Sequence, residues 1–211
     1  MPNVFLGLDG EMSASDLARG GRLVQIGLAA GTAESDRFVE VIGWAEGEFA
    51  ADPKAMAVHG IPAERILAAP RAAEVDERAF AFCLAHGGSA AHRTLIAVGW
   101  NVGAFDMPFV KDALPRTCSL FSRRTVDLNA VCFTLGGVLR LGGSSPKWNT
   151  LKRLAKDAAQ AALLAGGTAT TWHDAGYDAL ASLLAWQWLR DRIRQPAADA
   201  APSDPAPSFG V

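Results

Sequence analysis

The stretch VFLGLDGEM, residues 4–12, decides the fold because a short apolar strand runs directly into two carboxylates. Residues 4–8 form the apolar run, and Asp9 and Glu11 follow at its end. Since alternate residues of an extended chain point to one face, an Asp-x-Glu pair can approach a single cation. Adjacent acids at the end of an apolar strand are costly unless a positive group lies between them, and their oxygens favour Mg²⁺ or Mn²⁺ over zinc. The alternative is an ordinary turn with two exposed acids.

The hydrophobic pattern beyond this stretch predicts a sheet and then helices. Residues 22–29 and 37–44 alternate in hydrophobicity, which predicts two more strands and an antiparallel meander. The apolar spacing becomes helical over residues 62–86, interrupted by Pro70, and residues 94–98 return to a buried strand. This order is typical of an α/β domain in which helices flank a mixed sheet.

The rest of the chain is predicted to be mainly helical. Helices are expected from Phe105 to Pro115 and over residues 126–139, 147–165 and 174–194, with a loop at residues 142–146. We therefore interpret residues 1–195 as one domain and the Pro- and Ala-rich residues 196–211 as a flexible tail.

The composition excludes several classes of protein. The chain has 211 residues, of which 50% are apolar and 20% charged, as is typical of a globular protein and not of a disordered chain or coiled coil. No apolar run approaches the roughly 20 residues of a membrane span, and acids near the N-terminus stand where a signal peptide would be apolar. We therefore expect a cytoplasmic protein with no membrane partner. Cys83, Cys118 and Cys132 are odd in number and widely spaced, which favours reduced thiols.

The net charge of −2 hides an asymmetry along the chain. Residues 111–156 carry nine Lys or Arg and two Asp, a net +7, so the remaining residues carry −9. Such a stretch is either a surface for phosphates or a set of solvated helix faces, and charge alone favours the second interpretation.

Two further segments combine acids with residues suited to catalysis. The segment GWNVGAFD, residues 99–106, follows a buried strand and opens a helix at Asp106, where a carboxylate would also suit a capping role. The segment HDAGYD, residues 173–178, opens the last helix, so that His173 and Asp178 can approach one cleft. A histidine at such a place is often structural or solvated.

The order and context of the three acidic segments resemble the DEDDh family of 3′-to-5′ exonucleases, whose relatives include oligoribonuclease, ribonuclease T and proofreading exonucleases. The matching features are an Asp-x-Glu at the end of the first strand, an Asp behind an Asn-x-x-x-Phe approach and a late His-x₄-Asp. DGEMS at residues 9–13 looks like the oligoribonuclease variant, and AVHGI at residues 57–61 is similar to another family segment. The resemblance covers about residues 3–192. It implies a ribonuclease-H-like fold, a central mixed five-stranded sheet with an antiparallel meander and then parallel strands, flanked by helices.

The same resemblance implies the catalytic roles. Asp9, Glu11, Asp106 and Asp178 would hold two divalent ions, Mg²⁺ or Mn²⁺, and His173 would be the general base. Two ions about 4 Å apart can stabilise the attacking and departing oxygens of a phosphodiester. Because histidine titrates near neutral pH, a neutral imidazole can accept the proton of the attacking water.

The resemblance also implies substrate contacts for Met12, Ser13, His59, Asn101 and Phe105. Met12 and Ser13 would meet the terminal nucleotide, and Phe105 would pack beneath it. Ser13 stands where the family usually has Thr and keeps the hydroxyl. Ala14 stands where Gly is common, which is tolerated only if the backbone does not need a positive φ.

The sequence thus predicts an enzyme, a metal-dependent 3′-to-5′ exonuclease that hydrolyses phosphodiester bonds at the 3′ ends of single-stranded RNA, oligoribonucleotides or DNA. The variant at residues 11–13 favours RNA. The alternative is a non-catalytic nucleic-acid-binding or polymerase-associated member of the same fold. The intact acids argue against it, because a binding module has little reason to bear their mutual repulsion. A homodimer is also expected from the resemblance, and Trp186 and Leu189 would suit either an interface or the core.

Overall fold

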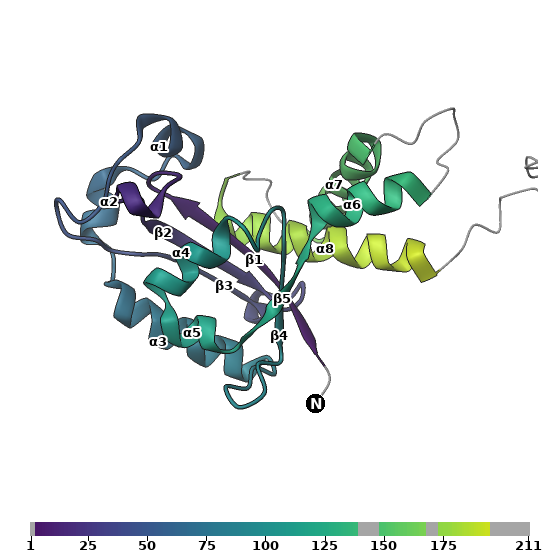
Figure 1. Cartoon of the computed structure of the whole chain (residues 1–211), viewed down its shortest axis with the longest axis horizontal. Helices are drawn as coiled ribbons and strands as arrows, with labels where there is room; N and C mark the ends of the chain where they lie inside the picture. Colours follow the sequence, from purple (N-terminus) through teal and green to yellow (C-terminus); the bar gives the residue numbers. More distant parts are fainter. Residues whose placement is uncertain (1–2, 139–147, 168–172, 195–211) are drawn as a thin grey trace, which may run out of the picture.

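The computed structural model describes residues 3–138, 148–167 and 173–194, which form a five-stranded sheet between two groups of helices (Figure 1). The strands are β1 (Val4–Met12), β2 (Leu23–Ala29), β3 (Arg37–Val41), β4 (Leu95–Gly99) and β5 (Phe121–Asp127). Their order in the sheet is β3-β2-β1-β4-β5. The first three strands pair antiparallel, whereas β4 and β5 run parallel to β1. The predicted mixed sheet is confirmed.

The helices cover both faces of this sheet. They are α1 (Pro53–His59), α2 (Ala63–Ala68), α3 (Ala72–Ala85), α4 (Asp106–Ala113), α5 (Pro115–Ser119), α6 (Leu128–Val138), α7 (Trp148–Ala165) and α8 (Ala175–Arg194). Short 3₁₀ turns lie at Leu17–Arg19 and Glu34–Asp36. One core joins the sheet to α3, α4 and α5, and a second core joins it to α6, α7 and α8 on the other side (Figure 1).

β1 is longer than the sequence predicts. The apolar run was expected to end at Asp9, yet the strand continues to Met12 because β2 pairs with it throughout. Asp9 lies opposite Gly27 and Glu11 opposite Gln25. The two carboxylates therefore belong to the strand itself, and the sheet holds their backbone.

Several other elements differ from the prediction. The resemblance implied a fifth strand, but the hydrophobic pattern did not locate β5, and the helix predicted over residues 126–139 begins only at Leu128 because its first two residues belong to this strand. The strand predicted over residues 37–44 ends at Val41, and the following Gly43 pairs with Arg71. Helix α1 was also missed. It is seven residues long and begins at Pro53, with Asp52 as a capping residue.

Some of the remaining predicted features agree with the structure, and others lie outside the described residues. Pro70 separates α2 from α3 as expected, α7 and α8 begin within one residue of their predicted starts, and all three cysteines are free thiols. Pro115 follows the end of α4 and also starts α5, a second short helix. The predicted loop at residues 142–146 and the tail at residues 196–211 lie outside the described residues. Among the described helices, none has the length and apolar character needed to cross a bilayer.

Helix α8 lies unusually close to the sheet, and two glycines make this approach feasible. A Cβ atom added at Gly7 of β1 would overlap the backbone oxygen of Ala179, and one added at Gly27 of β2 would overlap that of Ala175. Gly7, Asp9 and Glu11 are alternate residues of β1, so they share the face that α8 covers. The helix therefore packs backbone to backbone against the strand that carries the acids.

The variant Gly27→Ala is expected to destabilise the protein by about 1–3 kcal/mol or more, because the new methyl group must displace α8 from the sheet. Urea unfolding would measure the loss. Gly166→Ala is the matched control, since a Cβ atom there would lie 3.5 Å from the nearest atoms and should change the free energy of unfolding by less than about 0.5 kcal/mol. Equal stabilities for the two variants would contradict this description of the α8 packing.

Candidate active site

Four carboxylates from three separate parts of the chain meet in one pocket. Asp9 and Glu11 come from β1, Asp106 from the first residue of α4 and Asp178 from the first turn of α8. Together with His173 they line a cavity of about 230 Å³. The structure thus brings together all five residues for which catalytic roles were predicted, although what they do stays a prediction.

A backbone hydrogen bond joins Asp106 to β1. The chain leaves β4 at Gly99 and forms a loop before α4 begins at Asp106. The N–H of Gly10 donates to Oδ1 of Asp106 over 3.0 Å, and Asp106 is only 4% exposed. Because Gly10 lies between Asp9 and Glu11, this bond holds the third carboxylate beside the first two.

The start of α8 is fixed by a polar clamp that sequence reasoning missed. Gln25 of β2 is buried, its Nε2 donates to Oδ2 of Asp174 over 3.1 Å, and its Oε1 accepts from the N–H of Ala175 over 3.1 Å. Asp174 in turn caps the helix by accepting from the N–H of Tyr177. The only signal in the sequence was a lone polar residue within the apolar run LVQIGLA, residues 23–29.

His173 sits directly ahead of α8, as predicted, and is exposed at the mouth of the pocket. Its backbone has a φ of 65°, in the left-handed region that residues other than glycine seldom adopt. Its N–H donates to Oδ2 of Asp178 over 3.0 Å. This contact ties the histidine backbone to the carboxylate with which it shares the pocket.

Burial disfavours ionisation of all four carboxylates, and repulsion among them adds to this for Asp9 and Glu11. Burial raises the pKa of Glu11 to about 8 and that of Asp106 to about 7. The pKa of Asp9 is raised well above its ordinary value by burial and then by the charges of Asp106, Asp178 and Glu11. Burial also raises the pKa of Asp178, although the N–H and charge of His173 oppose this rise. Without a cation, the pocket favours protonated acids.

The donor set fits a hard divalent cation. Ligand atoms of Glu11, His173 and Asp178 lie within 4.8 Å of one another, and Asp9 and Asp106 add carboxylate oxygens at the same pocket. Oxygen-rich sites of this kind suit Mg²⁺ or Mn²⁺. A bound cation would also remove the repulsion that raises the pKa values of these acids.

A lysine from α7, the last cation of the basic stretch at residues 111–156, also lines the acidic pocket. The charge of Lys156 lowers the pKa values of Asp9 and Asp178. Its Nζ lies 5.3 Å from the ring centroid of Trp100, which also lines the pocket, and Nζ of Lys152 lies 5.2 Å from the same ring. Helix α7 thus places positive charge beside the Trp100 ring of the β4–α4 loop, at one wall of the pocket.

Met12, Ser13 and His59 lie around the end of β1. Met12 and Ser13 are buried, and the Ser13 hydroxyl accepts from the N–H of Arg22 over 3.0 Å. Nδ1 of His59 accepts from the N–H of Ile61 over 3.0 Å. Burial lowers the pKa of His59, the Met12 backbone opposes this effect, and the charge of His173 adds to it. Ala14 is not among the described residues with positive φ, so the replacement of glycine there is unstrained.

The other two predicted substrate residues occupy different sides of the loop between β4 and α4. Phe105 lines the acidic pocket, is 36% exposed and packs against Phe109. Asn101 is exposed with a φ of 66°, and its N–H donates to Oδ1 of Asp127 over 3.2 Å. Asn101 lies on the loop between β4 and α4 and does not line the acidic pocket.

The residues considered for a dimer interface belong to the core. Leu189 is fully buried among α6, α7 and α8, and Trp186 packs against Phe5 with ring centroids 5.6 Å apart. Their position outside the main apolar stripe reflects the breadth of the surface that α8 buries. Neither side chain supplies evidence for a homodimer.

The basic stretch at residues 111–156 does not form one surface. Arg116 pairs with Glu77, whereas Lys152 and Lys156 contact Trp100 beside the acidic pocket. Lys111 and Arg123 line a second cavity, while Arg140 and Lys147 lie outside the described residues. The stretch combines solvated helix faces with cations near two cavities.

The fold is ribonuclease-H-like, and two of the acids in the pocket lie on its central strand. No protein-family model matches the chain, and no curated protein matches it. Solved structures do. The chain is similar to the zinc-bound complex of E. coli exonuclease I with single-stranded DNA, with a TM-score of 0.60, 19% identity and coverage of 93% of this chain and 42% of that one.

Two further structures agree. The complex of E. coli exonuclease I with a dT13 oligonucleotide has a TM-score of 0.60, 18% identity and coverage of 92% and 42%. The product-bound exonuclease I has a TM-score of 0.61, 16% identity and coverage of 92% and 45%. These neighbours are DEDDh 3′-to-5′ exonucleases of the ribonuclease-H-like superfamily. The chain spans less than half of their length and shares their fold.

Gln25→Met is expected to cost about 1–3 kcal/mol, because it leaves the buried N–H of Ala175 without its acceptor and releases Asp174. Urea unfolding would measure the loss. Gln160→Met on α7 is the matched control, since Gln160 is only partly buried and lies outside the clamp. Equal effects would show that the clamp does not hold α8.

The stability of the metal-free protein is expected to fall as pH rises from about 4 toward 8. The folded-state pKa values of Glu11 and Asp106, about 8 and about 7, exceed their ordinary values, so the folded chain holds these protons more tightly than the unfolded chain. Their contribution is therefore complete below the unfolded values and is lost as pH rises through the folded ones.

Mg²⁺ should consequently raise the melting temperature more at pH 8 than at pH 5, by about 2–4 °C for each kcal/mol of repulsion relieved. Thermal melts in EDTA and in Mg²⁺ would measure this. The double variant Glu11→Gln with Asp106→Asn should show a flatter pH profile in EDTA and a smaller response to Mg²⁺. A wild-type response to Mg²⁺ that is the same at both pH values would contradict the prediction.

Proposed function

We propose that this chain is a metal-dependent 3′-to-5′ exonuclease that hydrolyses phosphodiester bonds at the 3′ ends of single-stranded nucleic acid. The observation that carries the proposal is the convergence of Asp9, Glu11, Asp106, Asp178 and His173 in one pocket. The fold shared with exonuclease I structures, two of them complexes with single-stranded DNA, supports the same activity.

The residues of the pocket suit this chemistry. When bound, two divalent ions supply the positive charge that stabilises the attacking and departing oxygens. The four carboxylates would hold these ions, whose charge would favour the ionised forms that burial, and for Asp9 and Glu11 also repulsion, disfavours. His173, exposed at the mouth, accepts the proton of the attacking water and can pass it to solvent.

The surroundings of the acids suit the end of a single strand. The cavity of about 230 Å³ is small, and Phe105 and Trp100 offer aromatic surface beside the carboxylates. Aromatic rings stack on bases of any sequence. Lys156 adds a positive charge at the same wall, where a phosphate next to the scissile bond would meet it.

Both RNA and DNA are candidate substrates. The variant at residues 11–13 favours oligoribonucleotides, whereas the exonuclease I complexes contain DNA. Ser13 does not decide between them, because its side chain is fully buried, outside the pocket lining, and its hydroxyl accepts from the N–H of Arg22.

Incubation of 5′-labelled single-stranded RNA and DNA with Mg²⁺ or Mn²⁺ tests the proposal. The wild type should give a ladder that shortens stepwise from the 3′ end, and EDTA should abolish it. Asp9→Ala should lower the rate by about 10³-fold or more, because it removes a carboxylate that holds the ions.

Asp157→Asn is the matched control, since Asp157 is an exposed acid on α7 beside Lys156 and outside the pocket. Its rate should equal that of the wild type. Intact substrate under every condition would overturn the proposal, and binding without cleavage would favour the non-catalytic nucleic-acid-binding alternative.

A further inference from the structure

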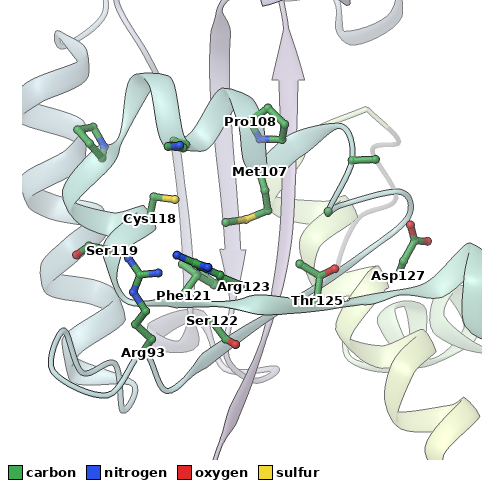
Figure 2. Close-up of a pocket in the computed structure, with 14 residues that line it drawn as sticks. Arg93, Met107, Pro108, Cys118, Ser119, Phe121, Ser122, Arg123, Thr125 and Asp127 are labelled. Carbon is green, nitrogen blue, oxygen red and sulfur yellow. The ribbon is translucent and has the colours of Figure 1, made fainter.

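A second, larger cavity lies on the other side of the loop that precedes Asp106. It has a volume of about 1030 Å³ and is formed by α4, α5 and β5, together with Arg93 from the loop before β4 (Figure 2). Arg93, Lys111 and Arg123 line it, and Figure 2 shows the guanidinium groups of the two arginines turned toward its interior. We call this cavity the basic groove.

The three cations of the basic groove lack acidic partners within the part of the chain that the structure describes. Several arginines outside the groove are paired, for example Arg78 with Glu40 and Arg116 with Glu77, although others such as Arg124 are not paired within the described residues. Arg93 and Lys111 are close enough to each other that both charges lower the pKa of the Cys118 thiol, which burial raises. The groove therefore gathers positive charge that the protein itself does not neutralise.

The one carboxylate among the lining residues is already occupied. Oδ1 of Asp127 accepts from the N–H of Asn101 over 3.2 Å and from the N–H of Asn129 over 2.9 Å. These bonds hold the loop and the start of α6. They leave the cations of the groove to an external anion.

The basic groove and the acidic pocket share a wall. Gly103 and Ala104 of the loop line the groove, whereas Trp100 and Phe105 of the same loop line the pocket. A Cβ atom added at Gly103 would lie 2.7 Å from Oγ1 of Thr125, so the loop packs tightly against β5. A strand that leaves the pocket over this loop enters the groove directly.

We infer that the basic groove binds the phosphates of a single strand on the 5′ side of the 3′ end that occupies the acidic pocket. This inference rests on the proposed function. Arg93, Lys111 and Arg123 provide the contacts that phosphates require, and the hydroxyls of Ser119 and Ser122 add donors. Met107 and Pro108 offer apolar surface to sugars and bases.

A polyanion suits this groove better than an added peptide strand. Phe121, Arg123 and Thr125 are alternate residues of β5 and line the groove together with Ser122, so the groove lies over the side chains of the strand, whereas an added peptide strand pairs with backbone groups. Because the groove adjoins the acidic pocket, we expect it to bind the same nucleic acid whose 3′ end the pocket would hold.

The experiment compares binding of 5′-fluorescein-labelled single strands of about 12 and about 3 nucleotides by anisotropy in EDTA, where cleavage is prevented. Lys111→Gln with Arg123→Gln should weaken binding of the longer strand roughly 25-fold at about 0.1 M salt. The slope of log affinity against log salt concentration should become shallower by about 1.4, which is about 0.7 for each phosphate contact. Binding of the short strand should not change.

Arg124→Gln is the matched control for Arg123→Gln, because Arg124 is the exposed neighbour on β5 that does not line the groove. Urea unfolding confirms that the variants are folded. Wild-type affinity in the double variant, equal losses for both strand lengths or equal effects of Arg123→Gln and Arg124→Gln would each overturn the inference. A poly-Glu peptide that binds through Lys111 and Arg123, while oligonucleotides bind regardless of them, would overturn it as well.

Failure of the inference can be told from failure of the proposed function. If the wild type cleaves nothing in Mg²⁺ or Mn²⁺ but the groove variants still weaken binding of the longer strand alone, the exonuclease activity fails and the groove stands. If cleavage depends on Asp9 and the groove variants bind like the wild type, the activity stands and the groove fails.

Discussion

The close packing of α8 on β1 and β2 is the constraint on which the candidate site depends. The backbone of the helix meets the sheet at Gly7 and Gly27, where any side chain would overlap it. Gln25 then fixes the first residues of the helix through Asp174 and Ala175. Because Asp178 is less than one turn further on, its carboxylate position follows from this packing. The chemistry of the pocket therefore rests on steric fit several residues away from it.

The packing that forms the pocket buries four acids, which makes their ionisation unfavourable. Buried acids favour their neutral forms, and the pKa values of Glu11 and Asp106 reach about 8 and about 7. Lys156 and the N–H groups of Gly10 and His173 offset only part of the repulsion. The net charge of −2 over the whole chain therefore conceals a local separation of charge, with four carboxylates in the acidic pocket and three cations in the separate groove.

The sequence predicts the elements that have a simple apolar pattern and fails where polar residues hold the fold. The meander, β4 and α8 follow from periodicity, and motif order names the five residues that meet in the acidic pocket. β5 escapes prediction because Arg123 and Arg124 interrupt its apolar pattern at an edge of the sheet. Gln25 and Lys156 escape it because their roles depend on residues distant in the chain, and no local spacing signals such contacts.

The order in which the acids occur along the chain has a consequence for the growing polypeptide. Asp9 and Glu11 emerge from the ribosome first, Asp106 midway, and His173 and Asp178 only after every strand of the sheet. A chain that ends before His173 and α8 therefore contains all five strands of the sheet but lacks two of the five residues that line the acidic pocket. Such a chain also lacks the helix that packs against Gly7 and Gly27.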